Sequence, residues 1–225
     1  MRSLLPVLLV VALHADDALC QNPPSPLARV DITATVGSFS ARRTEAPEYD
    51  EWTHSLFTSA GGGYYWTDHL KTEIDVASIG RSKAYGNEPA DVPDAPGSTI
   101  FLIHGYQGFA ISAGQSYQFG RNALFHPFVT GGVDVERRRH EIDRPAQSVA
   151  VYTRSPLNPQ SVQVSRQIPI PALQRTVSTV TVAPYAAAGF KAYFTERGFF
   201  RTDLKVTGRG GIDRVVWRAG FGVDF

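Results

Sequence analysis

The stretch from Val215 to Phe225 constrains the fold of this chain more than any other segment. Its residues alternate between apolar or aromatic side chains and side chains that are mostly small or charged. Successive side chains of a β-strand point to opposite faces, so the alternation predicts a strand with one apolar face. In water, exposing an apolar face of this kind would be unfavourable. The apolar set consists of Val215, Trp217, Ala219, Phe221, Val223 and Phe225.

A final Phe preceded by apolar or aromatic residues at alternate positions resembles the assembly signal of bacterial outer-membrane β-barrels. The residues that carry this resemblance are Trp217, Phe221, Val223 and Phe225. It implies that the strand faces lipid and closes a sheet. It also implies three sets of partners: outer-membrane lipids, the barrel assembly machinery and periplasmic chaperones. The resemblance says where the protein goes, and it implies no particular activity.

The amino terminus has the pattern of a secretory signal peptide. A short basic segment precedes an apolar run from Leu4 to Ala15, which is too short for a membrane-spanning helix. We expect a signal peptide over residues 1–20, cleaved after Cys20 or, alternatively, after Ala15, and then a periplasmic segment over residues 21–29. Cleavage after Cys20 removes the single cysteine, so neither a disulfide nor a thiolate mechanism is expected.

Period-two alternation recurs through the rest of the chain and predicts further strands. It is clearest over residues 70–77, where Leu, Thr, Ile and Val alternate with charged residues and Ala. The 20 glycines and an aromatic content of 11% also favour strands and tight turns over helices. The predicted strands cover residues 30–42, 52–66, 70–85, 98–119, 126–140, 176–194, 199–207 and 215–225.

The connections between these strands alternate in length. They are short after the second, fourth and sixth strands, and longer and richer in proline after the first, third and fifth. Outer-membrane barrels have short periplasmic turns and longer external loops, and an even strand count leaves both termini in the periplasm. The chain therefore resembles a small OmpA-like barrel without a peptidoglycan-binding domain. We expect an all-β, eight-stranded antiparallel up-and-down transmembrane β-barrel over residues 30–225, in the cell outer membrane.

The longer connections are the candidate contact surfaces. Residues 43–51, 86–97 and 141–175 are expected to face the medium, where loops on a rigid barrel usually bind their partners. The last of these is predicted to be the longest irregular stretch, although part of it could extend the fifth and sixth strands and Val149–Tyr152 has a pattern that could pair as a strand. We expect a structural or surface-interaction role, with an extracellular ligand as a possible partner of this loop.

Charged residues gather on the face that would point into the barrel. Eight strands enclose an interior only wide enough for side chains to fill it. An unpaired buried charge is costly, so opposed charges in this interior should pair. This predicts a lumen plugged by ion pairs, and the alternative is a narrow gated pore. The predicted network contains Glu73, Asp75, Asp134, Glu136, Lys191, Arg201, Asp203, Lys205 and Arg218, with Asp31, Lys71 and Asp224 on the same face.

No pattern predicts a catalytic, cofactor or metal site. The histidines outside the signal peptide form no metal-binding pair, and Gly61–Gly63 lacks the Lys-Ser or Lys-Thr of a phosphate loop. These glycines indicate a bent, closely packed strand. A formal net charge of +1 gives no reason to expect nucleic acid as a partner.

Two other interpretations remain open. Some eight-stranded barrels are lipid A deacylases, which implies an outer-membrane lipid-modifying enzyme as an alternative, but His54 and Ser55 are adjacent and would point to opposite faces. A soluble lipocalin-like barrel would also have eight strands, with apolar residues turned inward around a ligand. On the membrane interpretation, an aromatic girdle is expected at Tyr64, Trp66, Phe119, Phe194 and Trp217.

Overall fold

The computed structural model describes residues 29–42, 52–89, 97–119, 124–154 and 162–225, together with Val92 and Ala95. The predicted signal peptide over residues 1–20 and the periplasmic segment up to residue 28 lie outside the described residues, as does the loop at 43–51. Among the described residues, no helix is long and apolar enough to cross a membrane.

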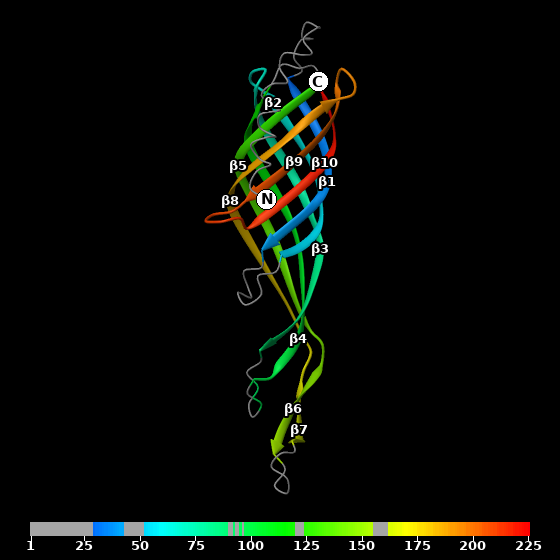
Figure 1. Ribbon diagram of the computed structural model, residues 1–225, viewed down its shortest axis with the longest axis vertical. Helices are drawn as coiled ribbons and strands as arrows, with labels where there is room; N and C mark the ends of the chain where they lie inside the picture. Colours follow the sequence, from blue (N-terminus) through cyan, green and yellow to red (C-terminus); the bar gives the residue numbers. More distant parts are fainter. Residues whose placement is uncertain are drawn as a thin grey trace, which may run out of the picture. The chain divides into compact units, whose positions relative to one another are not determined.

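Eight antiparallel strands form a closed barrel, which confirms the predicted fold class (Figure 1). Around the ring the order is β1, β10, β9, β8, β5, β4, β3 and β2. Each strand begins and ends within a few residues of its prediction, because the alternating pattern marks its length. The barrel strands are β1 (Val30–Arg42), β2 (Trp52–Tyr65), β3 (Leu70–Pro89), β4 (Thr99–Gln118), β5 (Phe125–Arg144), β8 (Leu173–Tyr193), β9 (Gly198–Thr207) and β10 (Arg214–Asp224).

The first and last strands close the ring. Ile32 of β1 lies opposite Val223 of β10, and Ala34 lies opposite Phe221. The backbone N–H of Phe225 donates to the carbonyl of Val30 at 2.8 Å. Closure leaves the barrel without an unpaired sheet edge.

The turns and loops fall at opposite ends of the strands. Short turns at residues 66–69 and 194–197 are closed by backbone hydrogen bonds from Trp66 to Leu70 and from Phe194 to Gly198. They lie at the same strand ends as Val30 and Phe225. We call this the turn end, and the opposite end, which carries the longer connections, the loop end.

The described residues between 141 and 175 are mostly strand, so the prediction of a largely irregular stretch is wrong, whereas the predicted extension of the flanking strands is confirmed. β5 continues to Arg144, β8 begins at Leu173, and between them β6 (Gln147–Arg154) pairs with β7 (Val162–Ile170). The predicted pairing of Val149–Tyr152 is confirmed. The prolines in this region favoured an irregular structure in the prediction. β7 nevertheless accommodates Pro169, because it pairs with only one other strand. Similarly, β3 extends to Pro89, into the stretch expected to be loop.

The chain divides into two compact units. The barrel unit comprises the residues up to Gly80, Gly108–Arg137 and Val180–Phe225, and the extension unit comprises Arg81–Gln107 and Arg138–Thr179. The extension unit has its own small apolar cluster: Val92, Ala95 and Val149 are buried, with Ile100, Val151, Ile168 and Ile170 packed against them.

Candidate lumenal ion-pair network

The barrel unit is charged inside and apolar outside. Six cationic and seven carboxylate side chains of its strands are buried, each at most 9% exposed. Neighbouring positions on the same strands are open: Ile74 is 56% exposed, whereas Glu73 is 8% exposed. Pleating explains this alternation, since successive side chains leave a strand on opposite faces. A lipocalin-like interior would need the reverse arrangement. The buried charged residues are Asp31, Lys71, Glu73, Asp75, Asp134, Glu136, Lys191, Arg201, Asp203, Lys205, Arg214, Arg218 and Asp224.

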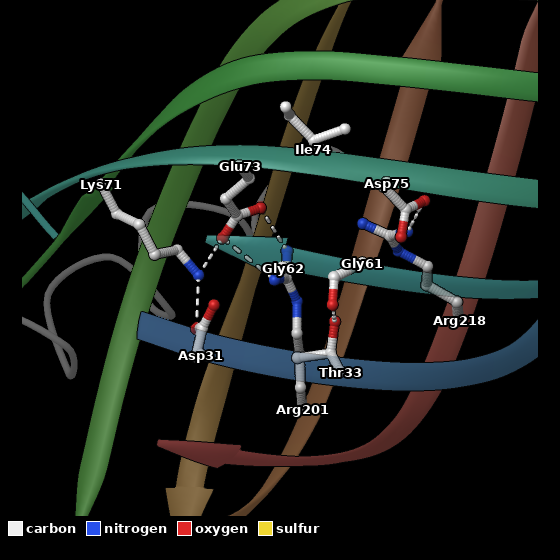
Figure 2. A pocket seen from close by; sticks show the side chains of 10 residues that line it. All are labelled: Asp31, Thr33, Gly61, Gly62, Lys71, Glu73, Ile74, Asp75, Arg201 and Arg218. Atoms are coloured by element: carbon white, nitrogen blue, oxygen red, sulfur yellow. Dashed lines mark hydrogen bonds and ion pairs between the residues drawn. The ribbon is translucent and has the colours of Figure 1, made fainter. Parts of the chain in front are cut away.

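The central part of the network is a chain of alternating charges. Arg201 of β9 donates from Nη1 and Nη2 to the two carboxylate oxygens of Glu73, both at 3.0 Å, and from Nε to Asp203 at 2.9 Å. Arg218 of β10 then joins Asp203 at 2.8 Å to Asp75 at 2.6 Å. A two-point Arg–carboxylate contact fixes orientation as well as distance. Figure 2 shows Glu73, Asp75, Arg201 and Arg218 converging from different strands.

Toward the turn end, one carboxylate serves two lysines. Asp31 accepts from Lys71 Nζ at 2.7 Å and also pairs with Lys191. Lys191 donates to the Tyr65 hydroxyl at 2.6 Å, and Gln118 donates to the same oxygen at 2.9 Å. Both lysines are fully buried, so these contacts replace the water that their ammonium groups lose.

Toward the loop end, Asp134 of β5 is the carboxylate that pairs with two cationic side chains. It accepts from Lys205 Nζ at 2.6 Å, from Arg214 Nη1 at 3.0 Å and from Ser112 Oγ at 2.7 Å. Arg214 also pairs with Glu136. Every predicted network residue is therefore buried, and each has an oppositely charged partner in one of these three groups.

Glycines make room for the long side chains of the network. A Cβ on Gly63 would lie 2.6 Å from Lys71 Cδ, and one on Gly61 would lie 2.8 Å from Asp75 Oδ1. The remaining cavity at this place measures about 10 Å³, which is about the room that one water molecule needs. It is lined by Asp31, Thr33, Gly61, Gly62, Lys71, Glu73, Ile74, Asp75, Arg201 and Arg218 (Figure 2).

An apolar layer also fills the interior of the barrel unit. Phe57 is 2% exposed, and it belongs to a buried cluster that draws residues from five of the strands. On each strand these residues lie on the same inward face as the buried polar residues. The cluster consists of Phe39, Ala41, Phe57, Ala77, Ile79, Ala110 and Val216.

Three parts of this interior were not predicted from the sequence. Arg214 was left out because its strand was expected to start one residue later, although it has the parity of Arg218. The phenol of Tyr65, which joins the turn-end group, was not singled out. The apolar layer was not foreseen either. Every second residue of β2 faces inward, and extending this alternation along the strand would have indicated Phe57 and Tyr65.

The outer face has the residues expected there. All four residues of the predicted assembly signal are exposed: Trp217 at 55%, Phe221 at 63%, Val223 at 42% and Phe225 at 61%. Four girdle residues, Tyr64, Trp66, Phe119 and Phe194, are exposed at or beside the turns, whereas Trp217 lies farther along β10.

A serine and a histidine meet on the outer face. Ser40 Oγ lies 2.8 Å from His54 Nδ1, so the partner of His54 is the residue opposite it on β1 and not Ser55. A catalytic histidine is normally oriented by a third group. Among the described residues, His54 has no such acidic contact, and no group of three His, Cys, Asp or Glu residues could hold a metal ion.

Comparison with known proteins bears on the fold. No protein-family model matches the sequence, and no curated protein matches it. Among solved structures, Neisserial surface protein A is similar, with a TM-score of 0.53 and 12% identity over 89% of this chain and 100% of that chain. The outer membrane protein OprG from Pseudomonas aeruginosa aligns over 91% and 99% of the two chains, with a TM-score of 0.49 and 9% identity.

The amino-terminal β-barrel domain of Pseudomonas aeruginosa OprF aligns over 89% of this chain and 100% of that chain, with a TM-score of 0.47 and 15% identity. The likeness to Neisserial surface protein A supports the fold assignment. The chain thus has the fold of a small outer-membrane barrel, as the resemblance of its last strand implied.

Proposed function

Because the chain has the fold of a small outer-membrane barrel, we propose that it is an integral protein of a bacterial outer membrane with a structural or surface-interaction role. Its lumen, on this proposal, is closed by the ion-pair network, and its loop end faces the medium. The observation that supports this most is the surface of the barrel unit, which exposes most of its large apolar side chains while the paired charges are buried inside. Only a solvent of low polarity favours such a surface over its whole circumference.

The pairing inside the barrel supports a closed lumen. Removing charges from water costs several kcal/mol per ion unless close partners replace the lost hydration. Here the carboxylates and cations lie 2.6–3.0 Å apart in the central and loop-end groups, with little space between them. An open aqueous channel would instead leave these groups hydrated and spaced apart.

Two measurements test the proposal. First, the protein is recovered from membrane and soluble fractions and run on an SDS gel with and without boiling. We expect a membrane-bound species whose mobility shifts only after boiling. A soluble protein with no shift would overturn the membrane assignment.

Second, the folded protein is inserted into a planar bilayer. We expect no steady conductance. The narrow gated pore remains the second candidate, because a charged lumen is also what a cation or anion path would need. In a pore, neutralising Arg201 or Glu73 would raise conductance without loss of stability. In a plug, the same change lowers stability and leaves conductance at baseline.

A further inference from the structure

The extension unit contains a buried pair of histidines that the ion-pair network does not include. His104 of β4 and His140 of β5 are 5% and 8% exposed. Nδ1 of His104 lies 2.9 Å from Nε2 of His140, so the two imidazoles share a hydrogen bond between neighbouring strands.

The geometry of the pair identifies the kind of contact. The ring centroids are 5.2 Å apart and the planes differ by 20°. The centroid separation is about the sum of two centroid-to-nitrogen distances and the 2.9 Å distance between the two nitrogens. Both nitrogens must therefore lie close to the line that joins the two ring centroids. Two ligands of one metal ion would instead direct their lone pairs at a third point beside that line. The arrangement is that of an N–H···N bond with one proton between the two nitrogens.

The surroundings provide compensation for one positive charge. Glu88 of β3 has Oε1 2.8 Å from His104 Nε2 without a hydrogen bond between them, so its carboxylate compensates positive charge on His104. Tyr106 of β4 stacks on His140 at 4.5 Å. Two further charges lie on β5 and β8. Arg138 lies on the same face of β5 as His140, and Arg175 is the charged residue in the part of β8 that belongs to the extension unit. The other neighbouring charges, Arg81, Arg139 and Glu141, pair with one another.

We propose that His104 and His140 form a proton-operated latch between β4 and β5 in the extension unit. With no added proton, one imidazole donates and the other accepts. With one added proton the bond persists, because the cation donates to the neutral ring and faces the Glu88 carboxylate. With a second proton, both facing nitrogens carry hydrogen and positive charge, so the bond is lost and the rings repel.

The latch therefore opens at the second of two coupled protonation steps. Imidazole is the side chain whose charge changes between about pH 8 and pH 5, so acidification of the medium is the stimulus. Opening would loosen β4 and β5 within the extension unit. Ile100, which precedes His104 on β4, packs on the cluster formed by Val92, Ala95 and Val149, so the apolar contacts of that cluster would loosen with it.

Hydrogen exchange measured by mass spectrometry tests the latch in the full-length protein folded in detergent micelles. Exchange, corrected for intrinsic rates, is compared between about pH 8 and pH 5. We expect residues 99–107 and 138–144 to exchange about tenfold faster in acid, as loss of one buried hydrogen bond implies, while β9 and β10 stay unchanged. No acid-dependent change in the wild type would overturn the proposal.

Variants separate the pair from general acid effects. His104→Phe and His140→Phe keep an aromatic ring but remove the shared proton, so neither should show the acid-dependent rise. His54→Gln removes a histidine of the barrel unit and should behave as wild type. A rise that persists in both Phe variants, or disappears in His54→Gln, would contradict the latch.

A second readout does not depend on the variants folding. In wild-type protein with ¹⁵N-labelled histidine, the two imidazoles should titrate in two separated steps, and the signal of the shared N–H should vanish at the second. Independent titration of the two rings in single, unlinked steps would also contradict the proposal.

Discussion

Arg201 and Glu73 meet inside the barrel through two parallel hydrogen bonds of 3.0 Å, although 128 positions separate them in the chain. Arg201 lies on β9 and Glu73 on β3, which are not neighbouring strands. The contact therefore spans the interior and joins opposite parts of the wall.

Breaking this contact should destabilise the barrel strongly. Arg201→Met removes the guanidinium that joins the buried Glu73 and Asp203 carboxylates, and we expect a loss of about 3–5 kcal/mol in the free energy of unfolding. Urea titration of the protein folded in lipid vesicles measures this loss. Arg197→Met is the matched control, because Arg197 lies in an exposed turn.

A double variant tests whether the loss comes from unpaired charge. Arg201→Met combined with Glu73→Leu removes both members, so it should cost less than the sum of the two single changes. Additive losses would show that the two side chains act independently and would contradict the network.

The apolar layer should seal the lumen together with the ion pairs. Phe57→Ala opens space in the layer and should cost about 3–5 kcal/mol in unfolding free energy. Because the charged groups still fill the rest of the interior, we expect this variant alone to show no conductance in planar bilayers. Phe57→Ala with Glu73→Gln should conduct, since both barriers are weakened. Conductance in Phe57→Ala alone would mean that the ion pairs do not close the lumen.

Lipid exposure of the outer face can be tested with a single charge. Val133 of β5 is 48% exposed in the middle of the barrel section of that strand. In a membrane, Val133→Arg should lower the free energy of unfolding by about 2–4 kcal/mol. Ser178→Arg, at an exposed position in the extension unit, should have little effect. Equal, small effects at both sites would favour a soluble barrel.

Phe225 should matter for assembly more than for stability. Phe225 and Phe194 are 61% and 63% exposed, and both lie at the turn end, but only Phe225 belongs to the predicted assembly signal. We expect Phe225→Ala to reduce the heat-modifiable fraction in cells several-fold, whereas Phe194→Ala leaves it close to wild type. Refolding in vitro into detergent should be similar for both. Equal losses in cells would contradict the signal.

The alternation of side chains carried most of the fold prediction. Period two is a local property, so β10 and β3 could be recognised from their own residues, and turn lengths indicated which strand ends lie together. Inward parity also placed Glu73 and Arg201 on the buried face. Local patterns indicated only Val149–Tyr152 of β6 and missed β7, because proline and polar residues in residues 141–175 masked a hairpin whose apolar side packs on Val92 and Ala95.

The sequence by itself determined which residues form strands and which face of each strand is polar, because both follow from neighbours two positions apart. Only the tertiary structure decided which charge meets which. The register of closure sets Arg201 against Glu73, and the cross-strand pairing sets Ser40 against His54. The pairing of β4 with β5 also places His104 beside His140, a contact that the alternation within one strand could not indicate. Such contacts depend on how far each strand is staggered around the ring, and no single strand encodes that stagger.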